Sequence, residues 1–351
     1  MENIDKTVKR RYLNLEIIAF FLILIGVAAR IFMLIYYYYT HIIDPLRPWG
    51  DVTQNYNRSF GAYPIITLGL LTVFYYLSFG FFEIFVFWAF LWDLLICLMF
   101  YFVLKSFDIK NRNYAFGLFL INPFLFLNNS FSLANCGYHL TDSFFFLFFL
   151  TALIFYPKKE LYAKYLFYIF LGLSMCVKYY TIPALGFFII KCLYEKDWKE
   201  LKILTICIIP LLLIFIIFPL FYLDYYYIEL VAWNELGSYV PIYVRILPFL
   251  FISILFILLR LKKTDSFEII IISIIALGTY LFFSYPYLRW FQSIIFYGIL
   301  KEKEFFRLNL NFGFIKKEIN VNNHLLTFYL SFLGVMFSYL IIIFVFKNPI
   351  Y

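Results

Sequence analysis

The chain has 351 residues, of which 64% are hydrophobic and 14% are charged, and its formal net charge is +8 at pH 7. This composition excludes a soluble globular protein, because several apolar stretches of roughly 18 or more residues can each cross a hydrocarbon core about 30 Å thick. The positive charge needs no nucleic-acid partner, because basic residues beside membrane spans set orientation and meet anionic lipid. The five cysteines are scattered and odd in number, which argues against a disulfide framework or a zinc site.

The basic residues predict the orientation of the chain. Most of the 29 Lys and Arg residues fall in six short clusters that alternate with the apolar runs. Short loops rich in Lys and Arg stay in the cytoplasm, so we expect the clusters at the cytoplasmic ends of the spans. Seven basic residues stand outside the clusters, and those on the far side of the membrane are where we expect function: Arg30, Arg47, Arg58, Lys178, Arg245, Arg289 and Lys347.

The N-terminal part of the chain predicts a cytoplasmic tail, a span and an outer loop. Residues 1–14 form the basic tail, and the apolar run of about 15–38 is too long for the core of a cleaved signal peptide, so it is read as a retained first span. Residues 39–81 form the non-cytoplasmic first loop. Its apolar stretch 63–79 has about 17 residues, which is at the lower limit of length for a transmembrane helix. If this stretch crossed the membrane, every later basic cluster would lie on the wrong side, so we expect it to follow the outer interface or to enter and return.

The remaining apolar runs predict an all-α polytopic bundle. With the first span they give about eleven crossings, with the N-terminus inside, the C-terminus outside and a cytoplasmic loop at 301–324. No hydrophilic stretch is long enough to form a separate soluble domain, so residues 1–351 are expected to form a single integral-membrane domain. The expected later spans are 82–104, 114–127, 142–156, 165–177, 182–194, 203–223, 240–259, 267–283, 291–300 and 325–346.

In this topology a set of polar and aromatic residues collects at the outer face. Charged groups at membrane depth are costly, and they mark substrate paths by default. Cations suit the phosphate of a lipid headgroup, while aromatic rings and carboxylates suit a sugar, and a carboxylate can act as general base toward a hydroxyl. These parts together describe glycosyl transfer from a lipid-phosphate sugar. The residues are Asp44, Arg47, Asp51, His139, Asp142, Lys178, Trp233, Tyr287, Arg289 and Trp290.

Several motifs in this order resemble the integral-membrane GT-C glycosyltransferases. An outer-loop aspartate, Asp51, precedes the "AYPIITLGLL" run; Asp93 follows within "LWDLLICL", and then Asn122–Pro123 and "CGYHLTD". The "GLSMCVKYYTIP" and "YLRW" segments complete the set over roughly residues 15–300. The chain is most similar to polyprenyl-phosphate mannosyltransferases of archaea and bacteria and to the catalytic subunit of GPI mannosyltransferase I. It departs from them in lacking a tight acidic pair in the first loop and in carrying His139 where relatives commonly have a small or amide residue.

The resemblance implies an inverting transferase that uses a polyprenyl- or dolichyl-phosphate sugar, most simply mannose, and needs no metal or other cofactor. It implies a lipid-linked or glycan acceptor on the non-cytoplasmic face. Carried over to this sequence, Asp51 is the general base, with Asp44 as the second choice. Lys178 binds the donor phosphate, with Arg289 and Arg47 as further ligands. The resemblance leaves open whether a small accessory subunit is needed and whether the membrane is a prokaryotic plasma membrane or the endoplasmic reticulum.

Other interpretations of these residues stay open from the sequence. Asp51 can be a turn residue, Asp44 can simply end the first span, and Lys178 can extend to the interface for structural reasons. Asp93, alone within a span, is expected to pair with Arg30 rather than to act in catalysis. A secondary transporter or lipid flippase is the alternative function, although such proteins usually carry charges at the midplane and repeated halves. A non-catalytic subunit of a membrane assembly is the third.

Overall fold

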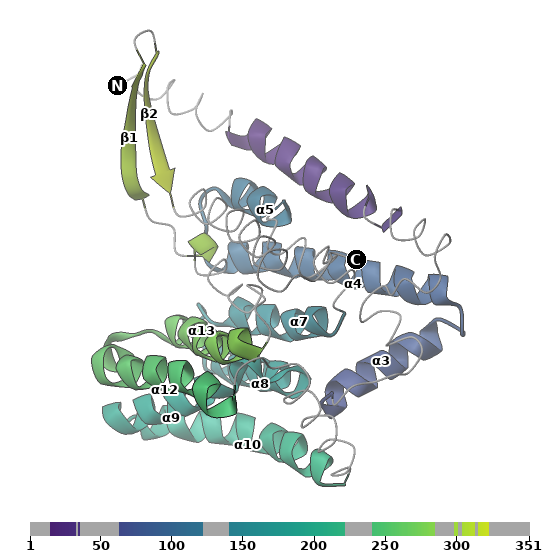
Figure 1. The fold of residues 1–351 in the computed structure, drawn as a ribbon, viewed down its shortest axis with the longest axis vertical. Helices are drawn as coiled ribbons and strands as arrows, with labels where there is room; N and C mark the ends of the chain where they lie inside the picture. The colour runs from purple at the N-terminus through teal and green to yellow at the C-terminus, as the bar shows by residue number, and fades with distance from the viewer. Residues whose placement is uncertain are drawn as a thin grey trace.

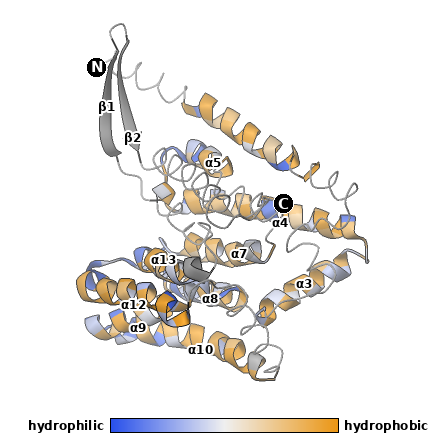
Figure 2. Cartoon of the chain, viewed as in Figure 1, coloured by the Kyte–Doolittle hydropathy of each residue, from blue (hydrophilic) through white to orange (hydrophobic). Residues whose placement is uncertain are grey.

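The computed structural model describes residues 15–32, 34–35, 63–121, 140–221, 241–284, 298–300, 304–312 and 315–322. Within these ranges the chain is predominantly helical and ends in a β-hairpin (Figure 1). Four helices are long and apolar enough to cross a membrane: Leu15–Phe32, Phe82–Ser106, Trp198–Phe218 and Ile242–Leu259. Each coincides with a span expected from the sequence. Figure 2 shows that hydrophobic residues predominate along most of the helices. The class of helical membrane protein is therefore supported at this level.

The other described elements follow the apolar runs closely. In chain order the labelled elements are α3 (Ile65–Leu77), α4 (Phe82–Ser106), α5 (Arg112–Leu120), α7 (Leu140–Phe155), α8 (Leu161–Val177), η2 (Tyr179–Thr181), α9 (Ile182–Glu195), α10 (Trp198–Phe221), α12 (Ile242–Leu259), η3 (Leu261–Lys263), α13 (Ser266–Ser284), β1 (Glu304–Phe312) and β2 (Ile315–Asn322). Several of these helices are short for a bilayer. The expected spans at 291–300 and 325–346 lie largely or wholly outside the described residues.

The helices from α4 to α13 form a bundle whose members run nearly side by side. Helix α7 packs between α4 and α8, α8 also packs on α10, and α13 packs on α9 and α12. Helix α3 is different, because it crosses the view obliquely to these axes and meets the start of α4 at a sharp turn (Figure 1). The turn uses two consecutive residues with positive φ, Phe79 at 53° and Gly80 at 80°. The backbone thus reverses within the four residues that separate α3 from α4.

Four turns that carry basic clusters lie together at one end of the bundle, which we call the basic end. Phe107, after α4, makes ring contacts with Tyr156, after α7, and with Phe267 in α13. The Lys164 ammonium donates to Glu200 at 2.7 Å, which joins the starts of α8 and α10. The ammonium of Lys191, near the end of α9, donates to the Thr264 carbonyl before α13. The grouping of these clusters agrees with the orientation expected from the sequence.

Burial affects the chemistry of one turn at the basic end. Tyr156 is surrounded by Phe107, Phe167 and Phe267. This burial, with a smaller contribution from the carboxylate of Asp265, raises the pKa of Tyr156 to about 12. The phenol is therefore neutral at physiological pH and joins the apolar packing of the turn.

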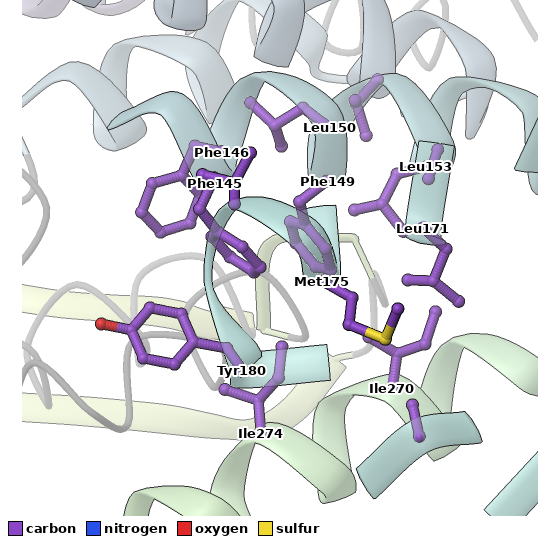
Figure 3. Packing of buried hydrophobic residues seen from close by; sticks show 14 of the residues in the cluster. Phe145, Phe146, Phe149, Leu150, Leu153, Leu171, Met175, Tyr180, Ile270 and Ile274 are labelled. Atoms are coloured by element: carbon purple, nitrogen blue, oxygen red, sulfur yellow. The ribbon is translucent and has the colours of Figure 1, made fainter. Parts of the chain in front are cut away.

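The core of the bundle is built from several helices, among them α4, α7, α8, α9, α10 and α13. Phe145, Phe149 and Leu153 of α7 point toward Leu171 and Met175 of α8, and Ile270 and Ile274 of α13 close the cluster (Figure 3). The rings of Phe145 and Phe149 stack with their centroids 5.4 Å apart. Aromatic rings provide large contact areas that dispersion attraction exploits even where lipid replaces water.

The first helix approaches α5 closely because each helix places a glycine against a leucine of the other. A Cβ atom on Gly26 would lie 2.5 Å from the Cβ of Leu120, and one on Gly117 would lie 2.7 Å from the Cβ of Leu22. Close backbone approach at small residues is a common basis of helix association in membranes, where lipid removes the hydrophobic driving force. These two glycines therefore set the distance between the first helix and α5.

Two strands within the expected cytoplasmic loop at 301–324 are an exception to the all-α expectation. Strands β1 and β2 pair antiparallel, with Leu308 opposite Ile319 and Phe312 opposite Ile315. The physical reason is a period of two in "FRLNLNF" and "IKKEINVN", which suits a strand and not a helix. The abundance of charged residues there led to the interpretation as a loop.

The glycine contacts generate a stability prediction. Gly117→Ala should destabilise the protein by about 1–3 kcal/mol, because the added methyl group overlaps Leu22 at a packed helix crossing. The thermal unfolding midpoint in mild detergent measures the effect. Gly69→Ala is the matched helical control, since a Cβ there meets nothing within 4 Å, and it should leave stability unchanged or slightly raised. Equal midpoints for the two variants would contradict the close approach.

Candidate functional site

Most of the residues expected at the outer face lie outside the part of the chain that the structure describes. Lys178 is fully described, and Asp142 is described only as a backbone position in α7. The others are Asp44, Arg47, Asp51, His139, Trp233, Tyr287, Arg289 and Trp290. Their roles stay predictions, and Lys178 is the one expected site residue whose side chain is described.

Lys178 lies at a sharp break between α8 and α9, at the end of the bundle opposite the basic end. Its backbone is extended, with φ −148° and ψ 142°, and η2 follows immediately. Pro183 in the first turn of α9 cannot donate a backbone hydrogen bond and suits a helix start. The chain therefore reverses direction over four residues, with Lys178 first among them.

Three buried hydroxyl groups lie at this break, and one of them satisfies a carbonyl at the end of α8. Thr67 of α3 donates to the carbonyl of Val177 at 2.7 Å. Ser174 donates to the carbonyl of Leu171, and its oxygen lies 3.2 Å from that of Thr181. The backbone amide of Lys178 donates to the backbone carbonyl of Ser174 at 3.0 Å. Buried polar groups are costly unless they are paired, so these bonds fix the backbone from which the Lys178 side chain extends.

The ammonium of Lys178 lies beside an aromatic ring that packs on a second ring. Its ammonium lies 5.6 Å from the ring centroid of Tyr180, within the range of a cation–π contact. The Tyr180 ring in turn packs edge-on against Phe145 at 5.1 Å, as Figure 3 shows. Phe145 is one helical turn from Asp142, so the start of α7 and the Lys178 break lie at the same end of the bundle. Asp142 and Lys178, the two expected site positions within the described residues, thus lie at the same end of the bundle.

Arg245 is a second isolated cation at this end, and it was not among the predicted site residues. It lies in the first turn of α12 and is only 2% exposed. Its guanidinium lies 5.5 Å from the ring centroid of Tyr280, near the end of α13. The sequence did carry a signal, because Arg245 is one of the seven basic residues outside the clusters. The signal was passed over because no motif surrounds it.

The expected pairing of Asp93 with Arg30 is confirmed. The Arg30 Nε donates to the Asp93 carboxylate at 3.0 Å, and the Arg30 Nη1 donates to the carbonyls of Gly26 and Leu120. Arg30 is 3% exposed and Asp93 is 5% exposed. Leu120 lies at the far end of α5, about 12 Å from the basic end at 1.5 Å per residue, so the pair lies near the middle of the bundle. It joins the first helix, α4 and α5 and serves structure.

Metal ligands do not gather in the described part of the chain. Among those residues no group of three or more His, Cys, Asp or Glu side chains could hold a metal ion. The four described cysteines, Cys97, Cys176, Cys192 and Cys207, are buried and free.

Comparison with known proteins yields no match, since no family model, no curated protein and no solved structure matches this chain. The functional interpretation therefore depends on the residues themselves.

The Arg30–Asp93 pair generates a prediction. Asp93→Ala should lower stability by about 3–5 kcal/mol, because it leaves the Arg30 guanidinium buried without its counter-charge. The double variant Arg30→Leu with Asp93→Leu should recover most of this loss. The free energy of unfolding in mild detergent is the measurement.

An exposed ion pair provides the control. Lys164→Ala removes the partner of Glu200 at the basic end, where the lysine side chain is 46% exposed, and should cost less than about 1 kcal/mol. A loss for Asp93→Ala no greater than that for Lys164→Ala would show that the central pair does not hold the helices together.

Proposed function

We propose that this chain is an integral-membrane glycosyltransferase of the GT-C type that uses a polyprenyl- or dolichyl-phosphate sugar. The observation that carries the proposal is the unequal distribution of cations between the two ends of the bundle. Exposed basic clusters occupy the basic end, whereas Lys178 and the buried Arg245 stand apart at the opposite end. Short basic loops stay in the cytoplasm, so we infer that the basic end is cytoplasmic and the Lys178 end is not.

The depth of Lys178 supports a lipid-phosphate ligand. Helix α8 has 17 residues and starts at the basic end, so Lys178 lies about 25 Å from that end. A hydrocarbon core is about 30 Å thick, which brings Lys178 close to its outer boundary. The phosphate of a lipid carrier in the outer leaflet lies at this boundary. An ammonium with a fixed backbone can meet it there at little cost in ordering.

Helix α3 is suited to shape the donor groove in this proposal. With 13 residues it is about 20 Å long, and unlike the helices from α4 to α13 it lies obliquely to the bundle (Figure 1). The bond from Thr67 to Val177 ties its start to the Lys178 break. We infer that α3 is the outer interfacial helix, in a topology of about eleven crossings with the N-terminus inside and the C-terminus outside.

The proposed reaction is a single displacement with inversion. Asp51, or Asp44 in its place, accepts the proton of the acceptor hydroxyl as the hydroxyl oxygen bonds to the anomeric carbon. The bond from that carbon to the phosphate oxygen breaks, and polyprenyl phosphate leaves. Lys178, Arg289 and Arg47 hold the charge that develops on the phosphate. No metal or other cofactor takes part.

The remaining outer residues are proposed to bind the sugar. Aromatic rings of Trp233, Tyr287 and Trp290 suit its C–H faces, and His139 and Asp142 suit its hydroxyl groups. We infer a mannosyl donor, a lipid-linked or glycan acceptor, and a site in either a prokaryotic plasma membrane or the endoplasmic reticulum. A small accessory subunit belongs to the proposal only through the resemblance to the GPI enzyme.

The alternative is a secondary transporter or lipid flippase, and one observation favours it. The Arg30–Asp93 pair places two charges near the middle of the bundle, where transporters carry coupling residues. However, Arg30 also donates to two backbone carbonyls, so the pair holds three helices together. We therefore favour transfer over transport.

Loss of the base tests the reaction. Asp51→Asn should lower transfer of tritiated mannose from dolichyl-phosphate mannose by about 10²–10⁴-fold in vesicles that contain a total lipid extract as acceptor. Asp44→Asn is the matched comparison and should be nearly silent. Full activity of Asp51→Asn together with loss in Asp44→Asn would reassign the base. Transport of the lipid without transfer would support the flippase, and inactivity of the unaltered chain in both assays would support a non-catalytic subunit.

Loss of the phosphate ligand tests the site. Lys178→Gln should weaken binding of dolichyl phosphate by roughly 10–100-fold, because a hydrogen bond to a charged group contributes about 1.5–3 kcal/mol. Lys178→Arg should retain part of the affinity because it keeps the charge. Lys262→Gln, at the basic end, is the control and should bind normally. Equal affinities for Lys178→Gln and Lys262→Gln would remove Lys178 from the site.

A further inference from the structure

The β-hairpin formed by β1 and β2 has two chemically different faces. Successive residues of a strand alternate between the faces of a sheet, and paired residues share a face. One face therefore carries four pairs, seven of whose eight members are apolar: Phe306–Val321, Leu308–Ile319, Leu310–Lys317 and Phe312–Ile315. The other face carries only polar pairs: Arg307–Asn320, Asn309–Glu318 and Asn311–Lys316.

An apolar face of this kind needs a cover. A lone two-stranded hairpin is at best marginally stable in water, and it becomes stable when one face packs against a further apolar layer. Neither strand makes an extensive contact with a helix in the part of the chain that the structure describes. The layer could be supplied by lipid, by another part of the chain or by a second copy, and the geometry separates these.

The direction of the hairpin favours lipid. In Figure 1 the hairpin lies on the side of the bundle where α4 ends, which is the basic end, and it runs across the direction of the bundle helices. Helices that cross a bilayer run along its normal. A ribbon that extends across them at one end of the bundle therefore follows the membrane surface. The strand of nine residues reaches about 30 Å along that surface.

The charges of the hairpin favour anionic lipid over a protein partner. Residues 301–322 hold five basic residues, Lys301, Lys303, Arg307, Lys316 and Lys317, against three glutamates. One of the five, Lys317, lies on the apolar face. A lysine within a protein–protein core is rarely tolerated, whereas at a lipid interface its methylene stem lies among the acyl chains and its ammonium reaches the headgroups.

We propose that this hairpin is a peripheral membrane-binding element that lays its apolar face on the leaflet at the basic end and binds anionic lipid. It follows the surface as an amphipathic ribbon, in the way that amphipathic helices lie in an interface. The basic residues supply attraction to anionic headgroups in addition to apolar burial. This proposal depends on the helices crossing a membrane and is independent of glycosyl transfer.

Two neighbouring positions on opposite faces provide the test. Ile319→Cys and Asn320→Cys are each labelled with the fluorophore NBD in the full chain, and the unaltered chain labelled in the same way gives the background. Each protein is placed in vesicles of phosphatidylcholine with phosphatidylglycerol that contain lipids spin-labelled on the acyl chain. We expect several-fold stronger quenching at Ile319→Cys than at Asn320→Cys. Unfolding midpoints in detergent confirm that both variants fold.

Charge dependence is measured with a second variant. Adding R307Q, K316Q and K317Q to Ile319→Cys should reduce its quenching to the level found in pure phosphatidylcholine. Equal quenching at the two positions would overturn the proposal, as would an Ile319→Cys label shielded from lipid in both mixtures, because the face is then covered by the chain itself or by a second copy. Quenching that the three glutamines leave unchanged would overturn the role of anionic lipid.

Discussion

The absence of water between the two ends of the bundle is the constraint on which this fold depends. A charge in hydrocarbon must reach an end, pair with an opposite charge or bind backbone carbonyls, because no solvent is there to hydrate it. The chain meets this demand in three ways. Its basic clusters gather at one end, Arg30 pairs with Asp93 and takes two carbonyls as acceptors, and Lys178 and Arg245 lie over tyrosine rings at the other end. Charges at either end can reach water or headgroups, whereas the Arg30–Asp93 pair between the ends can be held only by other protein groups.

The absence of water also explains why buried hydroxyl groups lie at the break between α8 and α9. Ending α8 at Val177 leaves carbonyls without helical partners, and each would be costly at this depth. Thr67 satisfies one of them from a different helix, α3. Because the bonded carbonyl belongs to Val177, this hydrogen bond links α3 directly to the backbone at Lys178. In the proposed function, this hydrogen bond fixes how the start of α3 sits beside Lys178.

How much could be predicted from the sequence differs between the fold and the site. Apolar runs such as 82–104 and 182–194 predicted α4 and α9 within a few residues, because hydrophobic length is a direct response to the bilayer. The partner of Asp93 could be predicted because Arg30 is the one isolated cation in the first span. The hairpin at 304–322 was missed because its period of two was outweighed by its charge. Arg245 was missed because its burial arises from tertiary packing that no local pattern encodes.

The site is less predictable than the spans for a physical reason. A span is specified by composition over about 20 residues, whereas a site is specified by a few side chains brought together from distant segments. In the described residues, the segments that carry Asp142 and Lys178 are brought together by the contact between Phe145 and Tyr180, and Tyr180 in turn lies beside the Lys178 ammonium. It arises from the packing of α7 on α8, which neither segment encodes alone.

The two ends of the bundle differ in the burial of their cations as well as in their number, and burial affects how strongly each cation attracts an anion. At the basic end Lys164 is exposed and already bound to Glu200, so its attraction for another anion is screened by water, by salt and by its partner. Arg245 is almost fully buried, and Lys178 is partly buried beside Tyr180, where the effective dielectric constant is lower. An anion that reaches them interacts more strongly per charge. This difference in burial supports the proposal that the end of the bundle with fewer basic residues binds the donor phosphate.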